Sequence, residues 1–173
     1  MMTERKGAAT FKGDPLTVIG NALSVGDKAP DFELLANDLS TVKLSDSAGK
    51  VRLLSVVPSL DTSICDLQTR RFNEEAAEMG EKVVAYAVSA DLPFAQDRWC
   101  SAAGVDRLET LSDHRDMSFG EAYGTWIKEL RLEQRAIFVV DGDGVIQYVE
   151  YVPEIAQHPD YDAALEALKK AGG

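Results

Sequence analysis

Apolar runs of strand length alternate with amphipathic stretches along the middle of the chain. Residues 51–57 and 83–88 are nearly continuous apolar runs, which is typical of strands covered on both faces of a sheet. Residues 65–79 lie between them, carry apolar side chains at every third or fourth position and end at Gly80, so they predict a helix. A second helix is predicted to start at Pro93, which suits a first helical turn, and to end at Gly104.

The N-terminal part of the chain carries the signals of short antiparallel strands. Two short apolar runs between residues 11 and 23 flank the turn sequence at residues 13–15, Gly-Asp-Pro. This pattern predicts an N-terminal β-hairpin. Two further short strands are expected near residues 32–35 and 41–44.

The C-terminal part predicts a second hairpin followed by a helix. The apolar run at residues 136–140 meets Asp-Gly-Asp-Gly at 141–144, a strong hairpin turn, and continues over residues 145–152. Residues 161–171 have the apolar stripe of a final helix. Strands that alternate with helices and end in a hairpin and a helix predict an α/β fold. We expect a central mixed β-sheet flanked by helices, preceded by the N-terminal β-hairpin, and this order is compatible with a thioredoxin-like core.

Length and composition limit the organisation of the chain. It has 173 residues, of which 45% are hydrophobic, enough for one core and one domain over residues 1–173. Residues 1–10 contain charges but no apolar run of signal-peptide length, and we expect them to be a flexible N-terminus. With no stretch long enough for a membrane-spanning helix either, the expected location is cytoplasmic.

Charge and cysteine content exclude several classes of protein. Lys and Arg number 18 against 29 Asp and Glu, a net charge of −11, which repels nucleic acids and anionic membrane surfaces. The two cysteines, Cys65 and Cys100, are too few for a disulfide-rich scaffold or a four-thiolate zinc site. They still allow one redox pair.

Cys65 lies at the start of the first predicted helix, just after a strand that ends at Pro58. A helix N-terminus and a nearby arginine both favour the thiolate, which is the nucleophilic form of a cysteine. The alternative is a small buried apolar residue, which is the usual role of a free cysteine.

Two further residues are candidates for a site around Cys65. Thr62 precedes it by three positions, so its hydroxyl can meet the sulfur or a substrate oxygen, or cap the helix. A dithiol oxidoreductase would have cysteine at that position, so a thioredoxin-style reductant is disfavoured. Arg135 directly precedes the strand at residues 136–140, from which it can reach the Cys65 loop, or it is a surface charge.

Residues 58–73 begin Pro-Ser-Leu-Asp-Thr-Ser-Ile-Cys and closely resemble the Pro-x-x-x-Thr-x-x-Cys signature of the peroxiredoxins, specifically the thiol peroxidase subfamily. Residues 89–100 resemble the helix that carries the resolving cysteine in that subfamily, and residues 118–124 and 135–141 resemble its later blocks. The resemblance therefore spans nearly the whole chain.

Three departures from the subfamily pattern stand outside the signature. Trp99 occupies a position where Phe is expected, His114 one where an aromatic residue is commoner, and Glu133-Gln134 a segment that is usually more apolar. Trp99 affects how easily the Cys100 helix unwinds, so it bears on the turnover rate more than on the reaction.

The resemblance implies a thioredoxin-like fold and a set of residue roles. Cys65 is the peroxidatic cysteine, whose thiolate attacks the peroxide and becomes a sulfenic acid while water or an alcohol leaves. Arg135 stabilises the thiolate and binds the peroxide oxygens, Thr62 orients the oxygen under attack, and Pro58 shields the sulfenic acid. Cys100 is the resolving cysteine of an atypical two-cysteine enzyme, and it forms an intramolecular disulfide with Cys65.

The resemblance also implies the partners. Thioredoxin recycles the disulfide, hydrogen peroxide and organic hydroperoxides are the substrates, and no cofactor or metal takes part. A homodimer is expected, and the enzyme serves antioxidant defence and redox homeostasis.

Two alternative functions, a peroxide sensor and a structural module, remain open. A peroxide sensor would share the first step but use the Cys65–Cys100 disulfide to change a protein contact. A structural thioredoxin-like module would consume no peroxide, and Cys65→Ser would change nothing.

Overall fold

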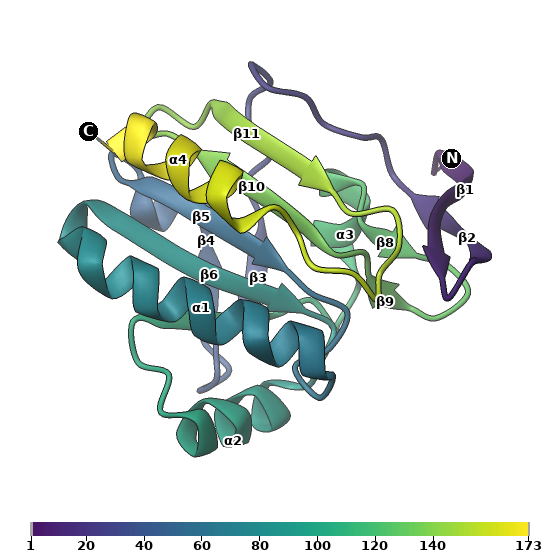
Figure 1. The fold of residues 1–173 in the computed structure, drawn as a ribbon, viewed down its shortest axis with the longest axis horizontal. Helices are drawn as coiled ribbons and strands as arrows, with labels where there is room; N and C mark the ends of the chain where they lie inside the picture. The colour runs from purple at the N-terminus through teal and green to yellow at the C-terminus, as the bar shows by residue number, and fades with distance from the viewer. Residues whose placement is uncertain (1, 173) are drawn as a thin grey trace.

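A seven-stranded mixed sheet forms the centre of the computed structural model, which describes residues 2–172 (Figure 1). Its strands are β3 (Glu33–Leu35), β4 (Thr41–Lys43), β5 (Val51–Val56), β6 (Val83–Ser89), β7 (Leu108–Ser112), β10 (Ala136–Val140) and β11 (Ile146–Tyr151). They lie in the order β11-β10-β5-β6-β7-β3-β4. The neighbours β5, β6 and β7 are parallel, and the other pairs are antiparallel.

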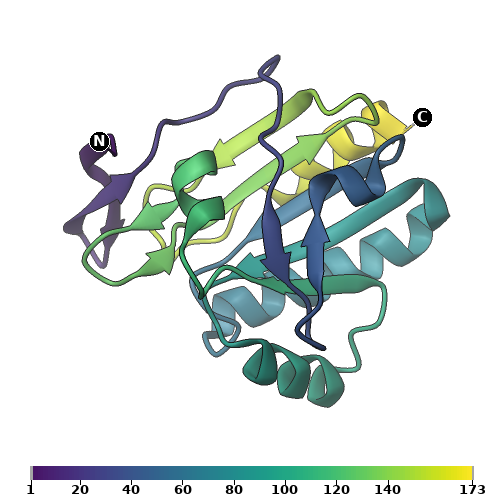
Figure 2. The same ribbon diagram turned by 180° about the vertical axis from the view of Figure 1, so that it is seen from behind.

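Among the residues that the structure describes, four α-helices lie around this sheet. They are α1 (Ser63–Met79), α2 (Pro93–Ala103), α3 (Ser118–Tyr123) and α4 (Tyr161–Gly172). Helices α1 and α4 cover one face of the sheet (Figure 1), α3 lies against the other face (Figure 2), and α2 packs against β7. The predicted α/β class, with a mixed central sheet flanked by helices, is confirmed. Within residues 2–172, no helix is long and apolar enough to cross a membrane.

Strand β5 shows why a continuous apolar run occurs in this sequence. Leu53 packs with Phe72 in the cluster under α1 and α4. Its neighbour Leu54 points to the opposite face and packs with Phe119 of α3. Each such leucine contributes about 1.5–3 kcal/mol by leaving water, so β5 is held from both sides and fixes the base of the loop that follows it.

The N-terminal hairpin belongs to a second, four-stranded sheet. Strands β1 (Glu4–Phe11) and β2 (Asp14–Ile19) pair with each other, and the short strands β8 (Trp126–Ile127) and β9 (Leu132–Glu133) complete the order β1-β2-β8-β9. The hairpin turns at Lys12 and Gly13, which both have positive φ, at 50° and 86°. Such a turn matches the twist of the strands on either side.

The N-terminal hairpin is confirmed, but its turn lies at Lys12 and Gly13 and not at residues 13–15, since Asp14 and Pro15 already belong to β2. The expectation of a flexible segment over residues 1–10 is wrong for residues 4–10. These residues form the first strand, which pairs with β2 from Glu4 to Phe11 around a register shift after Lys6. Ala9 is fully buried in the small core of this sheet. The charged start of the strand concealed it, because Glu4, Arg5 and Lys6 are exposed or half-buried and only Ala9 is buried.

Candidate active site

Cys65 is the third residue of α1, where the helix begins after the loop from β5. The unpaired amide groups of this first turn place positive partial charge near the sulfur. The thiol is fully buried and packs with Val57, Leu60 and the partly buried Trp99. It therefore has the burial of a structural cysteine together with the position of a reactive one.

Sheet pairing brings Arg135 to Cys65 across 70 positions of sequence. Strand β10 runs antiparallel to β5, so Ala136 lies opposite Val56, where the loop to Cys65 begins. Arg135 precedes Ala136, and its Nη2 donates a hydrogen bond to Cys65 Sγ at 3.2 Å. The side chain is buried, so the alternative of a surface charge is excluded.

Two neutral groups orient the Arg135 guanidinium. Gln68 Oε1 accepts a hydrogen bond from Nη1 at 2.8 Å, and the Ile155 carbonyl accepts from Nε at 3.2 Å and from Nη2 at 2.8 Å. The Gln68 amide is itself held by donation to Ser55 Oγ at 2.7 Å. The planar guanidinium is thus fixed on two sides, with Nη2 pointing at the sulfur.

The charge of Arg135 has no acidic partner. Among residues 2–172, no Asp or Glu lies within salt-bridge distance of it. An unpaired buried charge is costly, and Gln68 and Ile155 supply only dipoles. The Cys65 sulfur is directly adjacent, so the donor and the positive charge of Arg135 are directed at it.

A small pocket opens beside this pair of residues. It has a volume of about 190 Å³ and brings together three of the site residues predicted from sequence, Pro58, Thr62 and Arg135. Most of the remaining lining is apolar and includes Phe11 of the hairpin and Ile155. Cys65 is not among the residues that line the pocket, and its sulfur is fully buried against Val57, Leu60 and Trp99.

Thr62 occupies the N-cap position of α1, but its side chain does not cap the helix. Its hydroxyl donates instead to the Ser59 carbonyl at 3.0 Å, so the alternative of a helix-capping side chain is excluded. Because that bond uses the hydroxyl proton, the oxygen lone pairs are left to accept a hydrogen bond from a pocket ligand.

The loop that carries Pro58 is tied to the end of β6 by Asp91. Its carboxylate accepts hydrogen bonds from Ser59 Oγ at 2.7 Å, from the Leu60 amide at 2.8 Å and from Ser89 Oγ at 2.7 Å. Asp91 was not predicted as a site residue and only fell within residues 89–100, a block of family resemblance. The sequence Ser-Ala-Asp at residues 89–91, directly at the end of a parallel strand, is the signal from which a polar role for Asp91 could have been predicted.

Cys100 lies in α2 and is not brought to Cys65. Both cysteines are free thiols, and Cys100 Sγ lies 3.4 Å from Thr110 Oγ1 of β7. Its neighbour Trp99 makes the link between the helices instead, by donating from Nε1 to Asp66 Oδ1 at 2.8 Å. The two thiols therefore have separate partners.

Glu133 and Gln134, which depart from the family pattern, are buried next to Arg135. Burial raises the pKa of Glu133 well above its usual range, with the nearby Asp113 acting in the same direction. Glu133 accepts a hydrogen bond from Thr125 Oγ1 at 2.5 Å, and Asp113 accepts from the amides that begin α3. Glu133 thus ties β9 to Thr125, and Asp113 ties the end of β7 to α3, next to the chain leading to Arg135.

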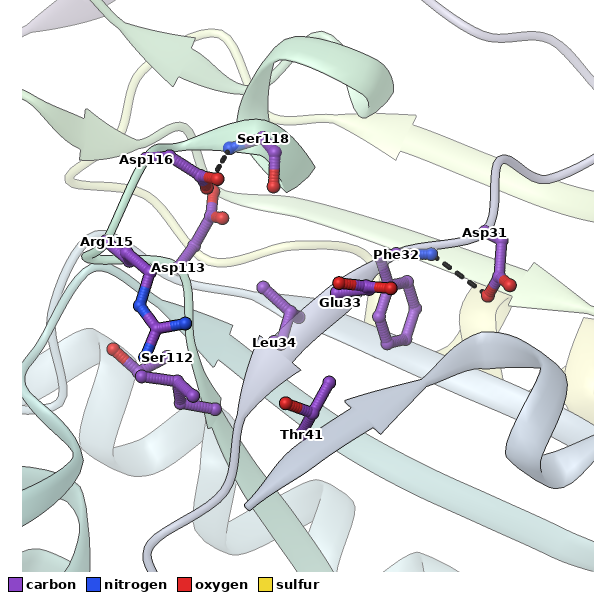
Figure 3. A pocket seen from close by; sticks show the side chains of 11 residues that line it. Asp31, Phe32, Glu33, Leu34, Thr41, Ser112, Asp113, Arg115, Asp116 and Ser118 are labelled. Atoms are coloured by element: carbon purple, nitrogen blue, oxygen red, sulfur yellow. Dashed lines mark hydrogen bonds between the residues drawn. The ribbon is translucent and has the colours of Figure 1, made fainter. Parts of the chain in front are cut away.

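A larger pocket lies elsewhere, between β3 and the loop from β7 to α3 (Figure 3). Its volume is about 410 Å³, and polar side chains such as Glu33, Arg115 and Asp116 line it. None of the site residues predicted from sequence is among its lining. In the part of the chain that the structure describes, no group of three or more His, Cys, Asp and Glu residues is placed to hold a metal ion.

Known proteins resemble this chain over most of its length. A family profile described as Redoxin matches residues 24–165. The chain is 61% identical over 162 residues to a protein of Halalkalibacterium halodurans named thiol peroxidase, which covers 94% of this chain and 97% of that protein. It is 59% identical over 160 residues to the thiol peroxidase of Bacillus subtilis, covering 92% of this chain and 95% of the relative.

Solved structures share the architecture. A peroxiredoxin-like protein from Aquifex aeolicus has a TM-score of 0.88 at 36% sequence identity, with 98% of each chain covered. The thiol peroxidase from Chromobacterium violaceum has a TM-score of 0.83 over 94% of this chain and 95% of its own. At 22% identity, that second structure supports the shared fold alone.

Proposed function

This chain belongs to the redoxin family and is a thiol peroxidase of the peroxiredoxin class with a thioredoxin-like fold, and from that premise we propose that it reduces hydroperoxides through Cys65. Hydrogen peroxide is reduced to water, and organic hydroperoxides to alcohols. The observation that carries the proposal is the hydrogen bond from Arg135 Nη2 to Cys65 Sγ, beside a pocket that Pro58 and Thr62 also line.

In the first step, the Cys65 thiolate attacks one peroxide oxygen. The S–O bond forms as the O–O bond breaks, so sulfur is oxidised by two electrons to a sulfenic acid and the peroxide is reduced. The leaving oxygen departs as hydroxide or alkoxide and takes a proton from water. Arg135 donates to the oxygens as negative charge moves onto them, which is stabilisation of the transition state by a fixed donor.

Thr62 and Pro58 act from the wall of the pocket. The Thr62 hydroxyl already donates to the Ser59 carbonyl, so it accepts a hydrogen bond from the peroxide O–H and orients the oxygen under attack. Pro58 is buried and has no amide proton, so it shields the sulfur without competing for the substrate. The apolar lining that includes Phe11 and Ile155 supports the acceptance of organic hydroperoxides.

In the second step, Cys100 attacks the sulfenic sulfur of Cys65. A disulfide forms within the chain, and the sulfenic oxygen leaves as water with the proton of the Cys100 thiol. Cys65 and Cys100 lie in different helices with different partners, and a disulfide requires Cα atoms within about 7 Å. We infer that one or both helix ends open before resolution, and thioredoxin then reduces the disulfide by thiol–disulfide exchange.

The proposal also includes a homodimer in the cytoplasm. Both features rest on the family relationship and on the use of thioredoxin as reductant. The molar mass in solution tests the dimer, since a mass near 18.8 kDa would contradict it.

A coupled assay tests the proposed function directly. The protein is mixed with thioredoxin, thioredoxin reductase, NADPH and either hydrogen peroxide or tert-butyl hydroperoxide. We expect continuous NADPH oxidation with both peroxides, at a rate proportional to protein. A single stoichiometric burst would favour a peroxide sensor, and an absence of any peroxide-dependent reaction would favour a structural module.

Trp99 should control the rate of the second step. Its indole Nε1 donates to Asp66 at 2.8 Å, and Arg70 lies over its ring at 5.7 Å while also pairing with Asp66 at 2.8 Å. This network joins the helix of Cys65 to the helix of Cys100. Trp99→Phe keeps an apolar ring but removes the hydrogen bond from the indole to Asp66. At a partly exposed position that bond stabilises the closed arrangement of the two helices by about 1 kcal/mol, so its loss should accelerate disulfide formation about fivefold.

The measurement is rapid quenching after one equivalent of peroxide, with the disulfide followed by mass spectrometry. Trp126→Phe, which removes the other indole, in β8, is the matched control and should leave the rate unchanged. An unaltered rate of disulfide formation in Trp99→Phe would show that this network does not limit opening.

A further inference from the structure

The tip of the N-terminal hairpin is joined to the loop that follows β11. Thr10 donates its amide to the Pro153 carbonyl at 2.7 Å, and its own carbonyl accepts from the Ile155 amide at 3.0 Å. These two bonds continue a strand-like pairing between Thr10 and Glu154. The hairpin therefore holds the backbone of residues 153–155.

The Glu154 side chain adds a second set of bonds at the same place. Its Oε1 accepts from the Gly13 amide at 2.9 Å and from Thr10 Oγ1 at 3.1 Å, and its Oε2 accepts from the Ala156 amide at 2.9 Å. One carboxylate thus connects the hairpin turn to both sides of Ile155.

This connection matters because of what Ile155 does. Its carbonyl accepts hydrogen bonds from both Nε and Nη2 of Arg135, and Nη2 is also the donor to Cys65. The position of the Ile155 carbonyl therefore fixes the direction in which Arg135 presents its donor. Gln68 holds the opposite side of the guanidinium, and its own side chain is held by Ser55 of β5 and not by Glu154.

We propose that Glu154 is a positioning residue for the peroxidase reaction: by tying the N-terminal hairpin to the loop of Ile155, it holds the Arg135 guanidinium against the Cys65 sulfur. The inference rests on the proposed function and extends the active site to the hairpin, which otherwise contributes Phe11 to the pocket. Glu154 touches neither the sulfur nor the pocket, so it acts through the backbone.

The charge state of Glu154 fits this role. Hydrogen bonds from the Ala156 and Gly13 amides lower its pKa, so the side chain stays ionised at neutral and mildly acidic pH. A group with a lowered pKa stabilises the folded arrangement above its unfolded pKa and loses that contribution as pH falls through the folded value. At neutral pH the carboxylate therefore accepts its bonds at full strength.

The hairpin offers a matched control for the test. Glu129 also holds it, since both carboxylate oxygens accept from the Thr17 amide of β2, at 3.0 and 2.9 Å. Glu129 has no bond to the loop of Ile155, and hydrogen bonding to Thr17 likewise lowers its pKa. Loss of either glutamate loosens the hairpin, but only loss of Glu154 removes a link between the hairpin and the loop of Ile155.

The experiment compares Glu154→Ala, Glu154→Gln and Glu129→Ala by single-turnover oxidation with hydrogen peroxide and by alkylation of Cys65 with iodoacetamide. We expect Glu154→Ala to slow the oxidation about tenfold, because a small displacement of a catalytic group costs much of its effect. Glu154→Gln, which keeps an acceptor oxygen, should recover part of the rate, and Glu129→Ala should stay within about twofold of the wild type.

Two results would overturn the inference. Equal losses in Glu154→Ala and Glu129→Ala would show that only the stability of the hairpin matters, and no loss in Glu154→Ala would show that Ile155 needs no support. Alkylation of Cys65 needs no peroxidase activity, so a wild-type protein that fails to consume peroxide refutes the proposed function separately. Thermal unfolding of each variant establishes that the compared proteins are folded.

Discussion

Cys65→Ser should consume no peroxide at all, whereas Cys100→Ser should consume about one equivalent per chain and then stop. Serine cannot supply the thiolate that attacks the O–O bond, so the first step is lost. Without Cys100 that step still occurs, but the sulfenic acid has no thiol within the chain to condense with. The measurement is peroxide remaining after incubation with each variant, with and without the thioredoxin system.

The two variants control for one another, because each removes one sulfur from a buried or half-buried position. Mass spectrometry of Cys100→Ser should show Cys65 as a sulfenic acid, or as its further oxidised forms at higher peroxide. Sustained thioredoxin-driven turnover by Cys100→Ser would remove Cys100 from the mechanism, and peroxide consumption by Cys65→Ser would remove Cys65.

Arg135→Met should slow the first oxidation by roughly two to three orders of magnitude, the scale reported for loss of a fixed donor to a developing oxyanion. The variant loses the donor to Cys65 Sγ and the positive charge beside it. The same change leaves the Gln68 and Ile155 oxygens without their partner, which also lowers stability. Single-turnover rates measured well below the unfolding temperature separate the two effects.

Arg52 provides the control for this prediction. Like Arg135 it is buried, but it belongs to β5 and lies opposite Val140, at the other end of that strand from Val56. Its guanidinium donates to the Ser47 carbonyl. Arg52→Met should lower the free energy of unfolding while leaving the oxidation rate close to that of the wild type. Equal rates in Arg135→Met and the wild type would contradict the role given to Arg135.

The fold could be predicted where its strands are covered on both faces. Residues 136–140 are a continuous apolar run and residues 51–57 a nearly continuous one, because β5 and β10 are packed between the two halves of the core. Strand β7 was missed, since its sequence Leu-Glu-Thr-Leu-Ser mixes polar and apolar positions, and α3 is only six residues long. The first strand of the hairpin was missed because pairing with β2, not its own composition, orders residues 4–10.

The site could be predicted in part from the chain itself. Cys65 and Arg135 stood out by position, and the antiparallel pairing of β5 with β10 explains their meeting. Gln68 carried a usable signal, because a residue three positions after Cys65 lies on the same face of a helix. Ile155 carried none, since it acts through its backbone carbonyl, and the burial of the Cys65 sulfur follows from the packing of Trp99 and Leu60 around it.

Mass spectrometry of the non-reduced protein, after one equivalent of peroxide, tests the central claim most directly. The claim is that Cys65 is oxidised first and that Cys100 of the same chain resolves it. We expect an intact mass of one chain minus two hydrogen atoms, and a proteolytic fragment that links Cys65 to Cys100. Oxidised protein whose Cys65 is linked to a second chain, or whose Cys100 remains a free thiol, would contradict it.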